Sequence, residues 1–165
     1  MSVFRPSLLK QDITAVSVEM LKEWGIKAVL LDVDNTLTTH NSQGLSLEVS
    51  AWLDAIKLAG ITPLIVSNGK EHRVRPFADK LGFPFTASAA KPLPFGFLRA
   101  KRQLGLQKHQ CVVIGDQIFT DVLGGKAAGM RVIQTLPLDT ASDTVCIRFK
   151  RKLEKILMKH WEVDV

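Results

Sequence analysis

The chain has 165 residues, of which 46% are hydrophobic and 23% are charged, and its formal net charge is +6. This composition predicts one soluble globular domain and excludes a membrane-spanning chain, because no apolar run is long enough to cross a bilayer. The positive charge permits an anionic partner, but few aromatic residues are available to stack on bases, so we expect no nucleic-acid partner. The first residues lack the apolar stretch of a secretory signal, which indicates a cytoplasmic protein and leaves peripheral membrane contact open.

In chain order, the first predicted element is an amphipathic helix over 12–24. Short apolar runs then alternate with amphipathic stretches through a core over 26–135, and a last helix is predicted over 146–160. This alternation predicts βαβ units, and therefore a parallel sheet with helices on both faces, within a single domain over 1–165. The core strands are predicted over 26–33, 61–67, 83–88, 110–116 and 130–135, and the helices between them over 46–59, 71–81, 94–104 and 117–128.

Two of these helices contain residues that disfavour a regular helix. Pro76 lies inside 71–81, so the regular part could begin only near the proline. Gly124 and Gly125 weaken 117–128 and indicate either a close backbone approach or an early helix end.

The last predicted helix is strongly basic. Between 148 and 160, six lysine and arginine residues stand against one acid, Glu154, which gives a net charge of +5. The helix could pack Leu153 and Ile156 on the domain and leave a solvated basic face. It could instead lie on anionic lipid, or contact RNA.

Polar residues gather where the predicted core strands end. In an open α/β sheet, the active crevice lies at the carboxyl ends of the strands, so we expect these residues to meet there. The residues are Asp32 and Asp34 after the first core strand, Ser67 and Asn68 after the second, Lys91 after the third, and Asp116 and Asp121 after the fourth.

Each of these residue types has a use in phosphoryl transfer. A carboxylate can attack phosphorus, and a second carboxyl two residues later can protonate the leaving oxygen and then activate water. Carboxylates from two strand ends make an oxygen-rich site for Mg²⁺, while a hydroxyl and a lysine can hold phosphoryl oxygens. Asp32 and Asp34 would then be tolerated at a buried strand end, because a magnesium ion, a lysine and backbone amides neutralise them.

At these positions the chain resembles the haloacid dehalogenase-like (HAD) superfamily. The resemblance rests on four motifs in order, "DVDNT" (32–36), "VSN" (66–68), Lys91 in "KP", and "GDQIFTD" (115–121). It implies a three-layer α/β/α Rossmann-like fold and a phosphoric monoester hydrolase, since Asp34 is typical of the phosphatases and phosphomutases of this superfamily. The gaps between the motifs hold only one crossover helix each, which implies a capless class III enzyme with no sizeable cap domain and an open site.

The resemblance also implies a role for each residue. Asp32 would be the nucleophile and a metal ligand, and Asp34 the general acid and base, with its carbonyl on the metal. Ser67, Asn68 and Lys91 would bind phosphate, with capping or positioning as the alternative for Asn68. Asp116 and Asp121 complete the Mg²⁺ site.

A closer resemblance is to the YqeG-type subfamily, through "SNGKEHRVRPFADKLGFPF", "AAKPLPFGF" and "GDQIFTDVLGGKAAGM". That subfamily is similar to mitochondrial phosphatidylglycerophosphate phosphatases of phospholipid biosynthesis, which implies a phospholipid headgroup as the substrate. The resemblance also implies a homo-oligomer, because capless relatives cover their sites with neighbouring subunits. Two alternatives stay open. One is a phosphatase of a soluble sugar phosphate or a nucleic-acid terminal phosphate, and the other is a non-catalytic protein that binds phosphate or RNA.

Overall fold

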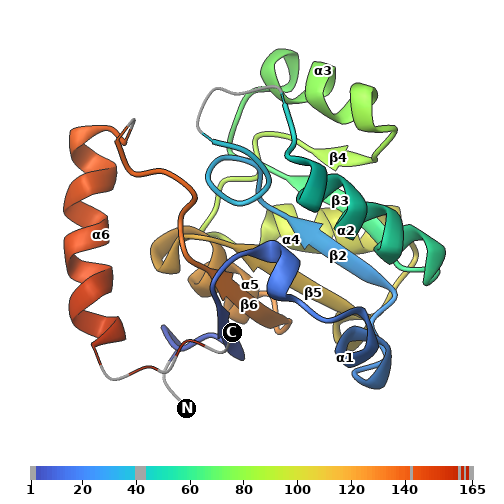
Figure 1. The fold of residues 1–165 in the computed structure, drawn as a ribbon, viewed down its shortest axis with the longest axis horizontal. Helices are drawn as coiled ribbons and strands as arrows, with labels where there is room; N and C mark the ends of the chain where they lie inside the picture. The colour runs from blue at the N-terminus through green and yellow to red at the C-terminus, as the bar shows by residue number, and fades with distance from the viewer. Residues whose placement is uncertain (1–2, 40–43, 142, 160, 162, 164–165) are drawn as a thin grey trace.

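The computed structural model describes residues 3–39, 44–141, 143–159, 161 and 163. Within these residues, six strands form one sheet in the order β1-β6-β5-β2-β3-β4, and every neighbouring pair is parallel (Figure 1). The predicted α/β fold is therefore confirmed. The strands are β1 (Leu8–Lys10), β2 (Ala28–Leu31), β3 (Thr62–Val66), β4 (Phe85–Thr86), β5 (Cys111–Gly115) and β6 (Arg131–Thr135).

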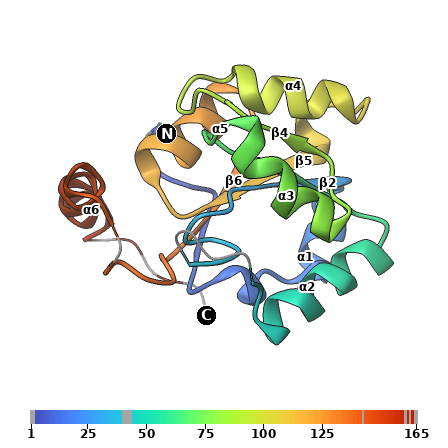
Figure 2. The ribbon, with the colours of Figure 1, turned by 90° about the horizontal axis from the view of Figure 1, so that it is seen from above.

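Helices cover both faces of the sheet and make the predicted three layers. Residues of α1, α2 and α3 pack into one hydrophobic core, and residues of α4 and of the turn before α5 pack into the other, as Figure 2 shows for α1 and α2 below the sheet and α4 and α5 above it. The helices are α1 (Val18–Glu23), α2 (Leu47–Leu58), α3 (Glu71–Leu81), α4 (Phe95–Gln103), α5 (Leu123–Ala127) and α6 (Val145–Met158).

The central strands explain the continuous apolar runs of the sequence. Every residue of β2 and of β5 is buried. Side chains alternate across a strand, so Val29 and Leu31 of β2 join one core while Ala28 and Leu30 join the other. A parallel strand covered on both faces therefore reads as an unbroken hydrophobic run that ends where the site begins.

The helix predicted over 12–24 is broken in two. A 3₁₀ turn forms at Ile13–Ala15, Val16 is extended, and α1 starts only at Val18. The reason is local hydrogen bonding, because the side chain of Asp12 accepts from Thr14 N and the side chain of Ser17 accepts from Met20 N, so each turn has its own N-cap. Ile13, Val16 and Leu21 are still buried, as their spacing predicted.

The predictions for the two helices that contain Pro76 and the Gly124–Gly125 pair compare differently with the structure. The expectation that α3 begins near Pro76 is wrong, because the helix runs from Glu71 through the proline to Leu81. Pro76 is exposed, so solvent can reach the carbonyl that the missing N–H leaves without a helical bond. Gly124 and Gly125 mark close backbone approaches, since a Cβ at these positions would lie 2.7 Å from Phe97 and 2.6 Å from Val132.

The basic segment forms α6, which ends at Met158; residue 160 of the predicted range lies outside the described residues. The interpretation that Leu153 and Ile156 pack on the domain is wrong, because both are exposed. The buried side chains of α6 are instead those of Arg151 and Glu154. Across the part of the chain that is described, no helix is long and apolar enough to cross a membrane.

Candidate active site

The carboxyl ends of β2, β3 and β5 border one pocket of about 430 Å³. β2 lies between the other two strands, so the segments that follow all three meet at the same edge of the sheet. The structure brings together all the site residues predicted from the sequence, and five of them line this pocket. These five are Asp32, Asp34, Ser67, Asn68 and Lys91.

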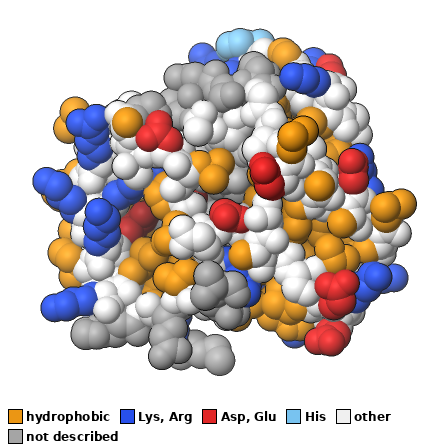
Figure 3. Space-filling model, viewed as in Figure 1, with side chains coloured by type: hydrophobic (Ala, Val, Ile, Leu, Met, Phe, Trp, Pro, Cys, Tyr) orange, Lys and Arg blue, Asp and Glu red, His pale blue; other side chains and the backbone are white. Residues whose placement is uncertain are grey.

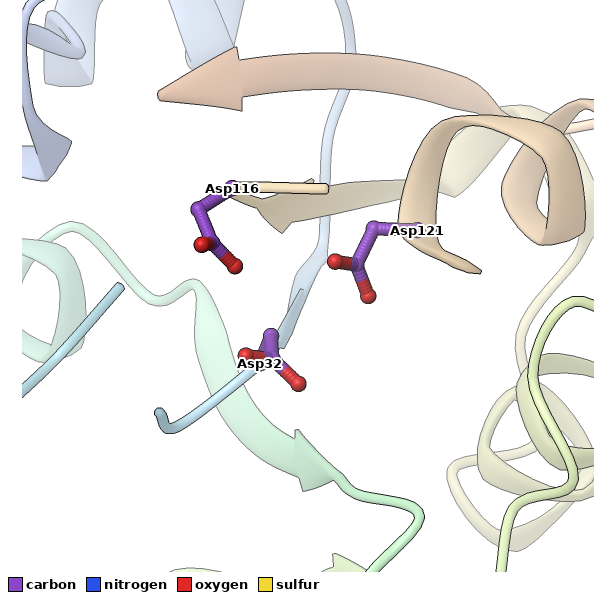
Figure 4. A group of neighbouring side chains, drawn as sticks. All are labelled: Asp32, Asp116 and Asp121. Atoms are coloured by element: carbon purple, nitrogen blue, oxygen red, sulfur yellow. The ribbon is translucent and has the colours of Figure 1, made fainter. Parts of the chain in front are cut away.

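An acidic cluster, formed by Asp32, Asp116 and Asp121, contains the two remaining predicted residues. One carboxylate oxygen of each lies within 4.8 Å of one oxygen of the other two. Asp32 follows β2, Asp116 follows β5, and Asp121 lies on the π-helical turn Ile118–Val122 before α5. Figure 4 shows the three carboxylates facing a common space. Carboxylate oxygens in this arrangement are the ligands that a hard divalent cation prefers.

Lys91 supplies positive charge beside the acidic cluster and is almost fully buried. Its Nζ donates to Asp32 Oδ1 and, at 2.7 Å, to Asp121 Oδ1. Burial by itself would lower the pKa of Lys91, but the carboxylates of Asp121 and Asp32 outweigh burial and raise the pKa above its usual value. The lysine therefore stays charged and ties two of the three carboxylates together.

The crowding of the acidic cluster is visible in the pKa values of its members. Burial raises the pKa of Asp32 to about 7, with contributions from Asp121 and Asp34 and against the opposing effect of Lys91. Burial, with Asp32 and Asp121, also raises the pKa of Asp116 well above its usual range, although Arg151 opposes this. A further cation would stabilise the ionised form of both carboxylates.

Asp116 has an oxygen available to such a cation. Its Oδ2 accepts a hydrogen bond of 2.7 Å from Arg151 Nη2, whereas its Oδ1 is buried without a hydrogen-bond partner among the described residues. A buried carboxylate oxygen without a partner is costly, and coordination would satisfy it. The oxygen-only donor set fits Mg²⁺ better than a soft metal.

Gly115 lets Asp121 reach the acidic cluster. A Cβ at position 115 would lie 2.6 Å from Asp121 Oδ2, so the carboxylate occupies the space that a side chain would fill. Gln117 N and Thr120 Oγ1 each donate to Asp121 Oδ2 at 3.2 Å. The "GDQIFTD" motif therefore folds back on itself and presents its second carboxylate toward the first.

Asp34 lies at the mouth of the pocket, outside the acidic cluster. Its side chain is 36% exposed and lies 3.6 Å from Arg73 Nη2. The next residue, Asn35, has a φ of +64°, a left-handed backbone that asparagine tolerates, and it turns the chain after β2. Asp32 and Asp34 consequently lie in different surroundings, and two carboxylates in different surroundings can do different chemistry.

Ser67 and Asn68 form the part of the pocket wall that follows β3. Ser67 Oγ accepts a hydrogen bond of 3.0 Å from Gly69 N, and this hydroxyl group keeps its own proton for another acceptor. Asn68 pairs with the main chain of Lys91, because its Oδ1 accepts from Lys91 N at 2.7 Å and its Nδ2 donates to Lys91 O at 3.1 Å. These contacts agree with the positioning alternative for Asn68 better than with direct phosphate contact.

Known proteins match this chain along most of its length. A family profile described as haloacid dehalogenase-like hydrolase matches residues 43–129, and one described as mitochondrial PGP phosphatase matches residues 1–76. The probable phosphatase YqeG of Bacillus subtilis (strain 168) is 39% identical over 155 residues, which cover 94% of this chain and 90% of that protein. The chain belongs to the haloacid dehalogenase-like hydrolase family.

More distant proteins extend the comparison. The phosphatidylglycerophosphate phosphatase 1, chloroplastic/mitochondrial, of Arabidopsis thaliana is 24% identical over 165 residues, and the match covers 94% of this chain but only 47% of that protein. The crystal structure of 3-deoxy-D-manno-octulosonate 8-phosphate phosphatase from Moraxella catarrhalis, in complex with magnesium ion, phosphate ion and KDO, aligns with a TM-score of 0.52 and 18% identity, over 87% of this chain and 92% of that one. That likeness shows the shared fold, and the relatives named as phosphatases support phosphatase activity for this HAD-like hydrolase.

The described residues of this HAD-like hydrolase include no cap domain. In the described part of the segment between Thr36 and Ser67 lie α2 and the core strand β3, and between Ser67 and Lys91 lie α3 and β4. The described residues therefore agree with the expectation of no sizeable cap domain.

Sequence reasoning missed the contribution of the C-terminal region to the site. Arg151 of α6 reaches both Asp116 and Asp143, and Glu154 Oε1 accepts from Ile118 N at 2.7 Å, within the turn that carries Asp121. Two more residues of α6, Ile147 and Lys150, line the pocket. The one available signal was Glu154 itself, a lone acid in a basic run three residues after an arginine.

Proposed function

We propose that this protein is a Mg²⁺-dependent phosphatase that hydrolyses a phosphate monoester through an aspartyl-phosphate on Asp32. The observation that carries the proposal is the placement of Asp32, which lines the pocket, pairs with Lys91 and belongs to the acidic cluster. A carboxylate held there can meet a phosphoryl group that enters from the open side. A lysine and a cation would face the oxygens on which negative charge spreads.

Asp32 and Asp34 have different roles in the proposed reaction. Asp32 attacks phosphorus, and the bond from phosphorus to the ester oxygen breaks. Asp34, in contact with solvent at the mouth, gives its proton to the departing oxygen. It then takes a proton from the water that attacks the phosphoaspartate, so inorganic phosphate leaves and Asp32 is regenerated. Lys91 and Ser67 hold the phosphoryl oxygens in both steps.

Asp32, Asp116 and Asp121, with the main-chain carbonyl of Asp34, would hold the magnesium ion. When bound, the ion would offset the negative charge of the carboxylates and of the phosphoryl group. Its presence would also favour the ionised, nucleophilic form of Asp32, whose pKa is raised to about 7 in the protein alone.

Phosphatidylglycerophosphate is the substrate that we propose. The support is the match of residues 1–76 to the mitochondrial PGP phosphatase profile and the relatedness to the plant enzyme of that name. The open pocket also suits a phosphate presented on a large assembly. Such a substrate stays in a bilayer, so the enzyme would work as a peripheral protein at a membrane surface, and a homo-oligomer is compatible with this role.

Phosphate release tests the proposal. The full chain would be given phosphatidylglycerophosphate in mixed micelles and, separately, a panel of soluble phosphate monoesters that includes sugar phosphates and an oligonucleotide with a terminal phosphate. Each reaction would be run with Mg²⁺ and with EDTA, and the Asp32→Asn variant would be run in parallel. We expect release from the lipid that is lost with EDTA and in the variant.

The other outcomes separate the parts of the proposal. Release from a soluble compound alone would keep the mechanism and discard the lipid substrate. No release from any substrate by the folded wild-type protein would discard the phosphatase and favour a phosphate-binding protein.

A further inference from the structure

Helix α6 stands to one side of the molecule and meets it mainly through charged side chains. Figures 1 and 2 both show the helix to one side of the sheet and its covering helices. Most of the contacts are ionic or polar, from Arg151 to Asp116 and Asp143, and from Glu154 to the backbone of Ile118, while Met158 at the end of the helix packs against a hydrophobic core. Amphipathic helices usually turn their apolar side to the core, so the arrangement here is reversed.

The apolar side of α6 faces outward. Val145 is 83% exposed, Phe149 is 64% exposed and Ile156 is 70% exposed. At 3.6 residues per turn, Phe149 lies about 170° around the helix axis from the midpoint between the buried side chains of Arg151 and Glu154. We call this stripe the outer face of α6, and its members are Val145, Phe149, Leu153, Ile156 and Leu157, all of them exposed.

Basic side chains lie along one edge of the outer face, and three of them, Arg148, Lys152 and Lys155, also line a cavity between α6 and the domain. Arg148, Lys152, Lys155 and Lys159 are exposed, and Glu154, the only acidic residue between 145 and 159, is buried against the turn before α5. Figure 3 shows lysine and arginine side chains gathered over α6, with hydrophobic side chains among them. The exposed part of the helix is therefore apolar along its middle and positively charged along one border.

We propose that the outer face of α6 is a docking surface for an anionic lipid bilayer. A bilayer surface offers acyl chains for the apolar stripe and anionic headgroups for the basic border at the same time. A second copy of this chain fits less well. Helices paired through the outer face would bring the basic border of one close to the basic border of the other, with no exposed acid on either helix to offset them.

The same helix also forms part of the pocket wall. Ile147 and Lys150 of α6 line the pocket that contains Asp32, and Arg151 holds Asp116 of the acidic cluster. A bilayer bound to the outer face would therefore contact the same helix whose opposite side forms part of the pocket wall. This inference rests on the proposed function for its purpose, but the binding itself requires no turnover.

Vesicle binding tests the proposal. The full chain would be mixed, in EDTA and without substrate, with vesicles of phosphatidylcholine alone or with phosphatidylglycerol added, and bound protein measured by flotation. The test variant is Phe149→Ser with Ile156→Ser. The control is Leu47→Ser with Leu58→Ser, which removes two apolar side chains of α2 that are even more exposed than Phe149 and Ile156. A second pair compares Lys152→Gln with Lys155→Gln on α6 against Lys22→Gln with Lys27→Gln elsewhere.

We expect the wild-type protein and both controls to bind the anionic vesicles and to bind the neutral ones weakly. Both α6 variants should lose at least about tenfold in affinity for the anionic vesicles. Absence of wild-type binding, or equal losses in test and control variants, would overturn the proposal. So would a wild-type dimer that ignores vesicles and dissociates on Phe149→Ser with Ile156→Ser, because the outer face would then bind a second copy.

Hydrolysis of a soluble aryl phosphate separates this result from the proposed function. The α6 variants should keep that hydrolysis and their thermal unfolding midpoint, because the substituted side chains are exposed and lie outside the acidic cluster. A wild-type protein that binds vesicles but releases no phosphate would refute the phosphatase proposal and leave the docking surface intact.

Discussion

Arg151 donates a hydrogen bond of 2.7 Å to Asp116 Oδ2, while Asp116 Oδ1 lies buried without a hydrogen-bond partner in the described part of the chain. Arg151 also donates to Asp143, and both carboxylates are buried. One arginine thus neutralises two carboxylates that would otherwise be costly in the interior. It also fixes Asp116 so that one oxygen remains available for a cation. Helix α6, which lies outside the sheet, therefore fixes the orientation of the Asp116 carboxylate in the acidic cluster.

Arg151→Gln should destabilise the protein by about 3 kcal/mol in EDTA, because two buried carboxylates lose their partner. The loss should be smaller in Mg²⁺, which would compensate the charge of Asp116. Urea unfolding with and without Mg²⁺ measures both values. Lys152→Gln, an exposed neighbour on the same helix, should stay within about 0.5 kcal/mol of wild type. A similar small effect for Arg151→Gln would show that the ion pairs contribute little.

Asp32→Asn should lower turnover by at least about 10³-fold, because an amide cannot form the phosphoaspartate. The fold should be retained, and in EDTA the variant should be at least as stable as wild type, since a neutral group replaces a buried carboxylate whose pKa is raised to about 7. Phosphate release and thermal unfolding give the two readouts. Turnover within tenfold of wild type would assign the nucleophile elsewhere.

The stabilising effect of Mg²⁺ should grow with pH. In the metal-free protein the pKa of Asp32 is raised to about 7, while in the unfolded chain it is about 3.9. At a pH between these two pKa values, Asp32 carries a proton in the folded state but not in the unfolded state. The free energy of unfolding of the metal-free protein therefore falls as pH rises. Binding of Mg²⁺ requires the ionised carboxylate and is therefore favoured at higher pH.

Thermal unfolding with Mg²⁺ and with EDTA, at about pH 5 and about pH 8, tests whether the stabilising effect of Mg²⁺ increases with pH. The Mg²⁺-induced rise in the unfolding midpoint should be larger at the higher pH. In Asp32→Asn the pH dependence of that rise should be weaker. An equal rise at both pH values in wild type would mean that Asp32 is already ionised at the lower pH.

The sequence predicted the centre of the fold better than its edges. β2 and β5 are buried on both faces, so their apolar runs could hardly be anything but core strands, and each ends directly at a predicted carboxylate. β1 was not predicted, because three residues at the sheet edge show no period that a sequence pattern could reveal. The broken N-terminal helix depended on the caps of Asp12 and Ser17, which the apolar spacing alone does not report.

In the site, too, the residues at the ends of the core strands were predicted and those from the edge of the fold were not. The predicted residues lie at strand ends, and a parallel sheet brings strand ends together whatever the loops do. The contributions of Arg151 and Glu154 could not be predicted, because they depend on where α6 lies in space. The helical period of α6 identified an apolar face correctly but could not say that this face points outward.

Asn68→Ala should lower kcat by about 10²-fold with little change in the inhibition constant of inorganic phosphate, because Asn68 holds the main chain of Lys91 through two hydrogen bonds. Asn68→Asp keeps the acceptor for Lys91 N and should lose less. Steady-state kinetics with phosphate as a competitive inhibitor separates the alternatives. Much weaker phosphate inhibition in Asn68→Ala, at an unchanged kcat, would favour direct phosphate contact over positioning.

Glu154 links α6 to the turn that carries Asp121, and its two variants should differ. Glu154 Oε1 accepts from Ile118 N at 2.7 Å and from Phe119 N at 3.3 Å. Burial raises the pKa of Glu154, so its charge is costly and the acceptor oxygen is what the turn requires. Glu154→Gln keeps that oxygen and should stay within about 1 kcal/mol of wild type, whereas Glu154→Ala leaves buried N–H groups without an acceptor and should cost about 2 to 3 kcal/mol. Urea unfolding compares them, and equal losses in both variants would show that the charge of Glu154, through its attraction to Arg151, matters more than the capping of the turn.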